Sequence, residues 1–498
     1  MSAARALNER TLAHHAARVA VPCYDRAALR PGVVHMSVGS FHRSHQAVYF
    51  DELAQRAISD EWGVIGVGLH RREMQRALAA QDGLYTVVAR GRRADEARIV
   101  GAITRYLFAP DDAGAVLDAL ADERVRLATL TITANGYLVD PCTGEFAADD
   151  PAVVADLAYP RRPRTALGYL VEGLDRRRRA GQAPLTVLSC DNMAGNGAVA
   201  RTAVLAFARL RDERLADWIE ERVAFPSSMV DRITPKTTPA DRRMVARRFG
   251  VSDRWPVMTE PFSQWIVEDA FCDRRPPLEE VGVQFVGNVR PYSLMKTRLL
   301  NASHSALGYL GCLAGHARTD EAMADAAFAG YVEQMMDDEI TPLLPPVANL
   351  DLPSYTATLR ERFANPAIGD QLPRLCRNGS MKVPRHVLSS VREARATGRP
   401  HALLTLAVAG WCRYLRGVDA HGRTLVVEDP AAARLQALAR AGGCDPRRLL
   451  RDEATFGLLG DDPAFAAALE RDLRDIDALG VRAVIAARTA PRRRLAPA

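Results

Sequence analysis

Short apolar runs alternate with amphipathic segments over the first 290 residues of the chain. Runs rich in Val, Ile, Leu, Thr and Gly are typical of buried strands, and they occur at 32–39, 62–68, 126–133 and 184–190. Segments with apolar residues at helical spacing lie between them, for example 112–121 and 163–179. This alternation predicts an α/β fold with a doubly wound parallel sheet.

The first predicted strand stops at Gly39 and leads directly into a segment, 40–53, that we expect to form one helix. A strand that ends in glycine before a helix presents backbone N–H groups to a phosphate. Ser37 occupies the position of the first glycine in a dinucleotide fingerprint, so the motif is imperfect. The cofactor-binding residues expected in this turn are Val38, Gly39, Ser40 and Phe41.

The sequence His70-Arg71-Arg72-Glu73 follows the second predicted strand, where such folds read the adenosine ribose of a dinucleotide. Glu73 can accept hydrogen bonds from the ribose hydroxyls, which favours NAD. Arg71 and Arg72 can neutralise a 2′-phosphate, which favours NADP. We expect Arg72 and Glu73 to contact the cofactor, and an exposed loop that binds no ligand is the alternative.

Polar residues follow two further predicted strands, at 131–137 and at Ser189-Cys190-Asp191-Asn192. In an open parallel sheet the ligand crevice lies beyond the carboxyl ends of the strands, so Asn192 is a candidate ligand-binding residue. A helix cap or an Asx turn is the other interpretation of Asn192. The charged pair Asp231-Arg232 lies between apolar residues. It is either a buried ion pair that stabilises the domain or a site carboxylate that shifts the pKa of a nearby amine.

An amine, an amide and an imidazole share one helical arc in the segment 296–304. At 100° per residue, Lys296, His304 and Asn301 fall at about 0°, 80° and 140°. This set suits proton transfer at an alcohol or carbonyl carbon: the lysine removes the hydroxyl proton, the asparagine holds the oxyanion and the histidine positions the same oxygen. Solvated or packing side chains at this spacing are the alternative.

The composition is that of a folded protein of more than one domain. A chain of 498 residues exceeds one hydrophobic core, and we expect a dinucleotide-binding domain at 1–290 and a substrate and catalytic domain at 291–498. No run of eighteen apolar residues and no secretory signal are found, so we expect no membrane partner and a cytoplasmic location. The eight cysteines lack zinc-site spacing and are expected to be reduced thiols, without a metal.

The net charge of +6 is modest, and its densest pieces are the runs Arg176–Arg179 and Pro491–Arg494. Nucleic-acid binding is one interpretation of such runs. A solvated face at the end of a helix is favoured, because no aromatic platform lies beside either run. We therefore expect no nucleic-acid partner.

The motifs, taken in order, resemble the mannitol dehydrogenase family of polyol-specific long-chain dehydrogenases, and the resemblance runs from about residue 30 to about residue 430. The resemblance implies a Rossmann-type N-terminal domain and a mainly α-helical C-terminal domain. It also implies zinc-independent hydride transfer between NAD(P) and a sugar or polyol in a cleft between the domains. The motifs that carry the resemblance are 34–47, 131–137, 189–192, 225–235, 260–269 and 296–304.

The family's site residues match positions of this chain one by one. The resemblance implies that Lys296 is the catalytic lysine, that Asn192 and Asn301 hold the oxyanion, that His304 orients the substrate and that Asp231 is the site aspartate. A later stretch, 371–384, resembles the substrate-binding segment of the family and places Arg374 and Lys382 at its basic positions. One glycine and two glutamates of the family are replaced in this chain, at Ser37, Ala134 and Ser293. Arg72 also lies where an acidic residue is frequent in NAD-preferring members of the family.

The resemblance implies an NAD(P)-dependent oxidoreductase that interconverts a sugar alcohol and its ketose, with mannitol and fructose as the favoured pair. NAD is the expected cofactor, NADP is the second option, and a monomer is expected. A hexuronate reductase acting on fructuronate and mannonate is an alternative, since Arg374 can pair with a carboxylate. A catalytically silent dinucleotide-binding protein is the alternative of another class, given the three replaced residues.

Overall fold

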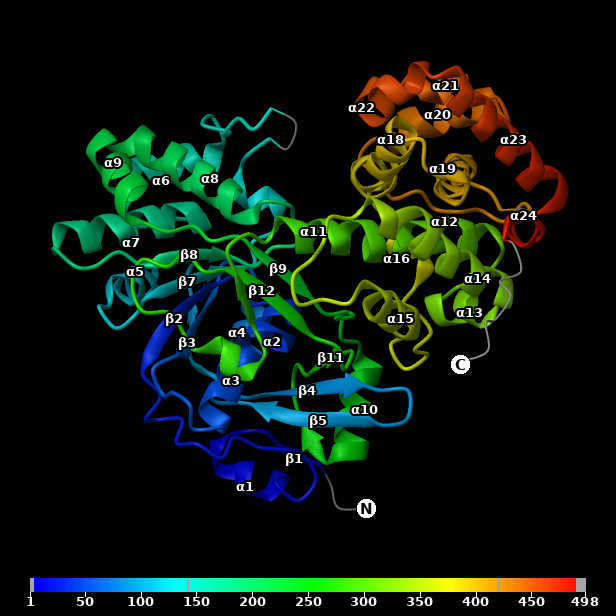
Figure 1. The fold of residues 1–498 in the computed structure, drawn as a ribbon. Helices are drawn as coiled ribbons and strands as arrows, with labels where there is room; N and C mark the ends of the chain where they lie inside the picture. The colour runs from blue at the N-terminus through cyan, green and yellow to red at the C-terminus, as the bar shows by residue number, and fades with distance from the viewer. Residues whose placement is uncertain (1–3, 141–142, 420, 490–498) are drawn as a thin grey trace. The chain divides into compact units, whose positions relative to one another are not determined.

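A computed structural model describes residues 4–140, 143–419 and 421–489 of the chain, which divides into two compact units, 1–290 and 291–498 (Figure 1). Cys142 and the predicted basic run Pro491–Arg494 lie outside the described residues. No helix within the described ranges is long and apolar enough to cross a bilayer. The fold of each unit follows from its own pattern of apolar residues.

A five-stranded parallel sheet forms the centre of the first unit, in the order β6-β3-β2-β7-β8. Its strands are β2 (Pro31–Met36), β3 (Gly63–Gly68), β6 (Ile103–Phe108), β7 (Leu127–Leu130) and β8 (Thr186–Ser189). The chain winds from β2 outward to β6 and then returns to β7 on the other side of β2. The carboxyl ends of β2 and β7 therefore flank the point where the strand order reverses, which is where such sheets bind ligands.

Helices cover both faces of this sheet, so the predicted doubly wound fold is confirmed (Figure 1). Val34 and Ile65 belong to a core shared with α5 (Ala113–Ala121), α7 (Ala166–Arg179) and α8 (Asn196–Arg211). The alternate strand residues Val33 and Val64 belong to a second core, shared with α3 (Gln46–Gln55) and α4 (Arg72–Ala79). Burial on both faces explains why the strands are apolar at successive positions.

Smaller sheets and further helices complete the first unit. β11 (Val257–Thr259) and β5 (Asp95–Val100) flank β4 (Tyr85–Arg90), and β13 (Gln284–Val286) and β9 (Ser228–Asp231) flank β12 (Gln264–Glu268). The remaining elements are β1 (Arg5–Ala6), η1 (Glu9–Thr11), α1 (Leu12–His15), α2 (Ser40–Ser44), η2 (Ala134–Tyr137), α6 (Pro151–Ala158), α9 (Glu213–Arg222), α10 (Pro239–Phe249), β10 (Val251–Ser252) and η3 (Leu278–Val281).

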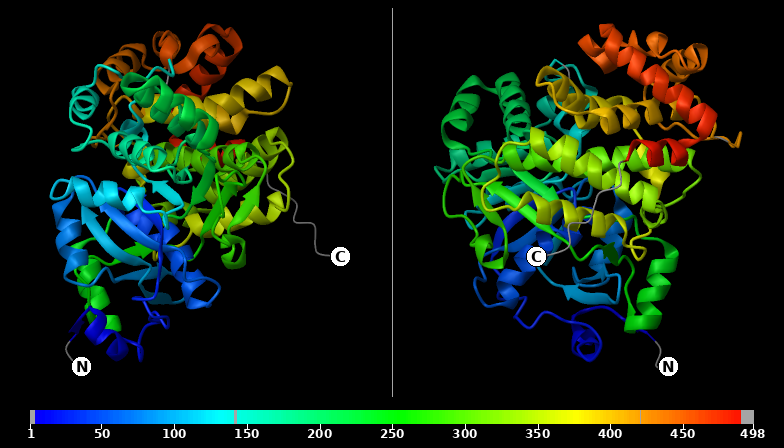
Figure 2. Two further views of the ribbon diagram at one scale, coloured as in Figure 1. Left: turned by 90° about the vertical axis from the view of Figure 1, so that its left-hand side faces the viewer. Right: turned by 45° about the vertical axis from the view of Figure 1, so that its right-hand side comes forward.

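The second unit is helical, and its described residues form no strand. α19 (Ala402–Tyr414) packs between α12 (Ala302–Leu313) and α23 (Pro463–Leu479) (Figures 1 and 2). Its other elements are α11 (Arg290–Lys296), η4 (Thr297–Asn301), α13 (Thr319–Ala324), α14 (Ala326–Gln334), η5 (Met335–Ile340), η6 (Thr341–Leu343), α15 (Leu352–Phe363), α16 (Leu372–Cys376), α17 (Gly379–Val383), η7 (Pro384–Leu388), α18 (Ser389–Ala396), α20 (Ala432–Gly442), α21 (Arg447–Leu450), α22 (Glu453–Phe456), η8 (Gly457–Asp461) and α24 (Val481–Arg488).

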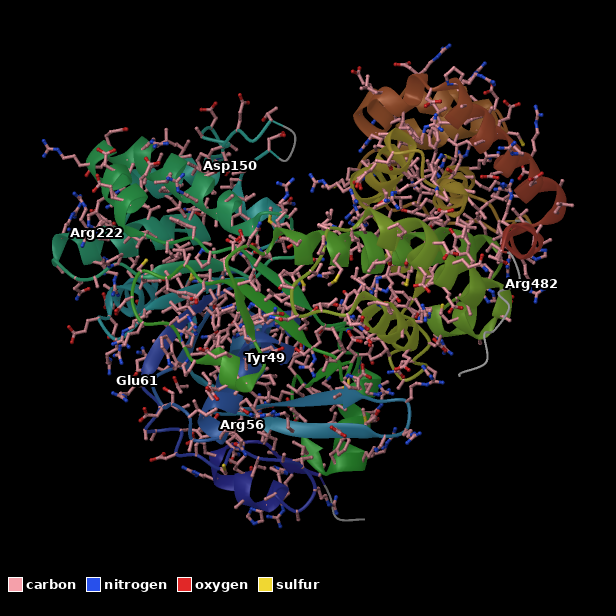
Figure 3. The ribbon with its side chains drawn as sticks, in the orientation of Figure 1. Tyr49, Arg56, Glu61, Asp150, Arg222 and Arg482 are labelled. Carbon is pink, nitrogen blue, oxygen red and sulfur yellow. The ribbon has the colours of Figure 1, made fainter. Side chains whose placement is uncertain are left out.

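The arginine run at the end of α7 is only partly a solvated face. Arg177 is buried, and its guanidinium donates to the carbonyl oxygens of Leu120, Asp122 and Ala183, so the predicted exposure is wrong for this residue. Arg179 is exposed and pairs with Asp175. Other arginines lie at the surface, as Figure 3 shows for the labelled Arg56, Arg222 and Arg482.

The segment 40–53 was expected to form one helix, and this prediction is wrong because the helix breaks at His45. His45 has φ −120° and ψ −88°, which separates α2 from α3. Polar side chains on both sides of the break are buried, among them His42, Arg43 and Gln46. The ring of His42 stacks on that of His35, with centroids 3.4 Å apart.

Ser37 adopts a backbone conformation that favours glycine, with φ +72°. A non-glycine residue in the left-handed region destabilises the folded state by about 1–2 kcal/mol. Glycine removes this strain, but its greater flexibility in the unfolded chain cancels about 0.5–1 kcal/mol of the gain. We therefore expect Ser37→Gly to raise the free energy of unfolding by up to about 1 kcal/mol, measured by urea denaturation. Ser40→Gly, in the first turn of α2, is the control and should not stabilise the protein. A loss of stability in Ser37→Gly would contradict the prediction.

Candidate functional site

The turn between β2 and α2 has the geometry of a phosphate-binding turn. The backbone N–H groups of Gly39 and Ser40 donate no hydrogen bond to any described part of the chain. A Cβ on Gly39 would meet nothing nearer than the Ser37 carbonyl oxygen at 3.9 Å, so the space beside this glycine is open. A Cβ on Gly66 would lie 2.8 Å from Val38, so this glycine lets the turn pack closely on β3. These features fit the diphosphate of a dinucleotide.

Residues 70–73, which follow β3 after the buried Leu69, are exposed, and one of the two arginines already has a strong partner. Arg72 donates two hydrogen bonds to the carboxylate of Asp111, at 2.9 and 2.5 Å, and its guanidinium lies 4.7 Å from the ring centroid of Phe108. This ion pair raises the pKa of Arg72 and lowers that of Asp111. Glu73 is exposed in the first turn of α4. Contact of either residue with a cofactor stays a prediction.

The buried carboxylate of Asp191 joins the ends of β7 and β8. It accepts hydrogen bonds from the backbone N–H groups of Ile132 (3.0 Å) and Thr133 (2.8 Å) and from the hydroxyl of Tyr137 (2.7 Å). Burial raises the pKa of Asp191, and these hydrogen bonds oppose the shift. The carboxylate therefore fixes the backbone that carries the next residue, Asn192.

Asn192 is exposed and does not cap a helix, since the residue that precedes α8 is Gly195. The buried Asn196 fixes the backbone of this loop, because its side-chain amide donates hydrogen bonds to the carbonyl oxygens of Asp191 and Ser228. The helix-cap interpretation of Asn192 is therefore wrong, and the side chain stays a candidate ligand-binding group. The sequence offered no distinct signal for Asn196.

Asp231 ends β9 and is buried. The hydroxyl of Ser228, at the start of β9, donates to the carbonyl oxygen of Ser189 at 2.7 Å, so β9 starts beside the end of β8. The guanidinium of Arg232 donates to the carbonyl oxygens of Ser44 and Glu260, and burial lowers its pKa to about 10. Asp231 therefore lies at the end of β9 that is remote from the contact between Ser228 and Ser189, in the same unit as Asn192.

Lys296 is buried at the end of α11, directly before a π-helical turn, η4. A π turn is wider than an α turn, so the predicted 100° per residue is wrong over 297–301. Two further π turns, η5 and η7, pack against η4. π turns are rare, and those that occur are often found at functional sites. Three of them lie around the segment after Lys296, which supports a functional site in this part of the second unit.

Several basic side chains share this environment. His304 lies in the first turn of α12, and its ring centroid is 4.6 Å from that of Phe363. The pKa of His386, on η7, is lowered to about 3. Burial is the largest cause, and the nearby positive charges of Lys382, Arg385, His304 and Lys296 contribute to the same shift. The second unit thus brings the predicted Lys296, His304 and Lys382 together. Sequence reasoning missed His386, which carries no recognisable spacing signal.

The two predicted substrate-binding residues differ in availability. Arg374, on α16, donates two hydrogen bonds to Asp370, at 2.8 and 2.6 Å, in an i, i+4 pair. The amine of Lys382, on α17, lies 3.4 Å from the carbonyl oxygen of Leu375. Burial lowers the pKa of Lys382, and the charge of Arg374 adds to the shift. Lys382 is therefore the less firmly held of the two cations.

Groups of three or more His, Cys, Asp or Glu placed to hold a metal ion do not occur within residues 4–140, 143–419 and 421–489. The candidate proton-transfer and oxyanion-binding residues are instead amines, amides and imidazoles. Such groups suit proton transfer and oxyanion binding.

The fold and these residues define a Rossmann-type dinucleotide-binding protein with a helical second unit, and comparison with known proteins gives its family. The family model for the mannitol dehydrogenase Rossmann domain matches residues 31–280, and that for the mannitol dehydrogenase C-terminal domain matches residues 288–477. The chain belongs to the mannitol dehydrogenase family.

Individual relatives agree over nearly the full length. The chain is 44% identical to mannitol 2-dehydrogenase of Aspergillus fumigatus over 488 residues, 95% of this chain and 97% of the relative. Mannitol 2-dehydrogenase of Pseudomonas fluorescens, solved as a ternary complex with NAD and D-mannitol, is 43% identical, with a TM-score of 0.86 over 97% of this chain and 99% of that one. A substrate-free D-sorbitol dehydrogenase is 36% identical, with a TM-score of 0.89 over 97% and 100%.

A buried carboxylate on one of the π turns generates a pH prediction. Glu339 accepts hydrogen bonds from the N–H groups of Leu403 and Leu404 at the start of α19, both at 2.8 Å. Burial raises its pKa from 4.5 to about 7. The folded protein thus holds this proton more tightly than the unfolded chain, and the contribution of Glu339 to stability is lost as the pH rises from about 4.5 through about 7.

We expect Glu339→Gln, which cannot ionise, to flatten the dependence of the thermal unfolding midpoint on pH between 5 and 8. The exposed Glu361 on α15 supplies the control: Glu361→Gln should keep the slope of the unchanged protein. Equal slopes in all three proteins would mean that Glu339 does not titrate in this window.

Proposed function

We propose that this chain is a zinc-independent, NAD-dependent polyol dehydrogenase that interconverts a secondary alcohol of a sugar alcohol and the ketone of its ketose. Mannitol and fructose are the favoured pair. The observation that carries the proposal is the 43–44% identity, over both units, to mannitol 2-dehydrogenases, one of them solved with NAD and D-mannitol. A cytoplasmic location and a monomeric state are proposals that rest on the sequence alone.

The first unit supplies the cofactor-binding groups. Gly39 and Ser40 hold the diphosphate through their backbone N–H groups, and Val38 and Phe41 flank it in the same turn. The N–H of Val38 itself donates to the carbonyl oxygen of Val67. Glu73 and Arg72 lie on the ribose side. When bound there, NAD accepts a hydride from the alcohol carbon. The open space beside Gly39 and the undonated N–H groups support this placement.

Lys296 acts as the base that removes the hydroxyl proton. A lysine base must be uncharged, and burial and nearby cations both favour the neutral amine. Lys296 is buried, and Lys382 belongs to the same neighbourhood. Asp231 is the proposed site carboxylate of the first unit, and a carboxylate close to Lys296 would favour the protonated amine.

The remaining polar groups hold the substrate and its developing charge. The amides of Asn192 and Asn301 donate to the oxyanion, and His304 orients the same oxygen. Lys382 and Arg374 bind the hydroxyls of the linear substrate through their several donors.

The hexuronate reductase alternative is not favoured. A substrate carboxylate is bound best by a guanidinium whose charge is not already paired. Asp370 takes two hydrogen bonds from Arg374, through Nε and one Nη, and so partly neutralises its charge. The silent dinucleotide-binding alternative has no support either, since Lys296, Asn301 and His304 are all present on one continuous segment.

The proposed function is tested by an absorbance assay at 340 nm with mannitol, arabinitol, sorbitol and mannonate, each with NAD and NADP. We expect the highest kcat/KM with mannitol. Lys296→Ala should abolish turnover while leaving NADH affinity, measured by fluorescence titration, nearly unchanged. Faster oxidation of mannonate than of any polyol would contradict the substrate, and near-normal turnover of Lys296→Ala would reject the base.

The two asparagines generate a second kinetic prediction. Removal of one oxyanion donor typically costs about 10²-fold or more in kcat. We expect Asn192→Ala and Asn301→Ala each to lower kcat on that scale, with a smaller change in KM. Asn196→Ala probes the positioning of Asn192 and should chiefly lower stability. Losses below about threefold in both asparagine variants would exclude the oxyanion role.

A further inference from the structure

The side chain of Arg71 is exposed and uncommitted at the end of β3. Arg71 precedes α4, and its guanidinium makes no hydrogen bond or ion pair with any residue that the structure describes. The adjacent Arg72 is different, because Asp111 and Phe108 hold its guanidinium. Of these two arginines, Arg71 is therefore the one whose charge and donors are available to a ligand.

The position of Arg71 in the sheet indicates which part of a dinucleotide it meets. β2 and β3 are adjacent and parallel, with Met36 opposite Val67, so their carboxyl ends lie at the same edge. A dinucleotide whose diphosphate lies at the turn after β2 places its adenosine ribose at the end of the neighbouring strand. In this chain that strand is β3, and the residues that follow Gly68 surround the ribose 2′ position.

Acidic residues are missing where β3 ends. NAD-specific Rossmann proteins usually have Asp or Glu there, which accepts hydrogen bonds from the 2′-hydroxyl and repels a 2′-phosphate. Here Leu69 is buried, and His70 and Arg71 are exposed. The first carboxylate is Glu73, which is already inside α4 and exposed. The strand end therefore lacks the group that excludes NADP.

We propose that Arg71, with His70 beside it, binds the adenosine 2′-phosphate of NADP, so that the chain binds NADPH with an affinity comparable to that for NADH. A guanidinium binds a phosphate monoester through two parallel hydrogen bonds, and the dianionic group favours a cation. This inference rests on the proposed function for the presence of a dinucleotide in the first unit. It adds a phosphate-binding site at the adenosine end.

The test is a fluorescence titration of the full chain with NADH and with NADPH, without substrate. We expect dissociation constants within about threefold of each other. Arg71→Ala should weaken NADPH binding by about tenfold or more and change NADH binding by less than twofold, and Arg71→Lys should restore part of the loss. The matched control is Arg76→Ala, because Arg76 is an exposed arginine on α4, the helix that Arg71 precedes, and it should leave both constants unchanged.

Salt separates the phosphate contact from other effects. The affinity for NADPH should fall more steeply with ionic strength than the affinity for NADH, and Arg71→Ala should remove this difference. NADPH binding more than tenfold weaker than NADH binding in the unchanged protein would overturn the inference and leave the proposed function intact. Equal losses for both nucleotides in Arg71→Ala would also overturn it. Failure of both nucleotides to bind would instead reject the proposed function.

Discussion

The carboxylate of Asp191 is the interaction on which the ligand-binding edge of the first unit depends. Two backbone N–H groups after β7 and the hydroxyl of Tyr137 all donate to this one buried side chain. A buried carboxylate that lost these partners would carry the full cost of its desolvation, so the strand ends stay in the arrangement that satisfies it. Thr133, which has a positive φ of 64°, is held in place by the same group. Because Asn192 directly follows Asp191, these hydrogen bonds also fix the position of its backbone.

Much of the first unit could be predicted because its central strands are buried on both faces. β2, β3, β7 and β8 appear in the sequence as continuous apolar runs. β6 was missed, because it is an edge strand whose Thr104 and Arg105 interrupt the apolar pattern. The break at His45 was missed for another reason: the apolar spacing of 40–53 continues across it, and the burial of polar side chains such as His42 and Arg43 could not be expected from the sequence pattern.

In the second unit, residue types could be predicted better than their surroundings. Lys296, Asn301 and His304 were found from their spacing, although the spacing assumed a regular α-helix. The regular apolar and polar spacing of this segment gave no sign of the π turn, which packs against η5 and η7. Asp370 was overlooked as the partner of Arg374, although an acid four residues before an arginine on a helix is a recognisable pair. His386 is distant in sequence from Lys296 and His304, and only the tertiary fold brings it near them.

The π turns also bear on which changes in chain length the second unit can accept. A π turn holds one more residue than the α turn it replaces. Deletion of a single residue within 297–301 would let the helix close into regular α-geometry, and everything after it would rotate by about 100° relative to Lys296. His304 would then leave the face on which it now lies. Substitutions in this segment alter one side chain at a time, whereas a one-residue deletion would re-aim the whole of α12.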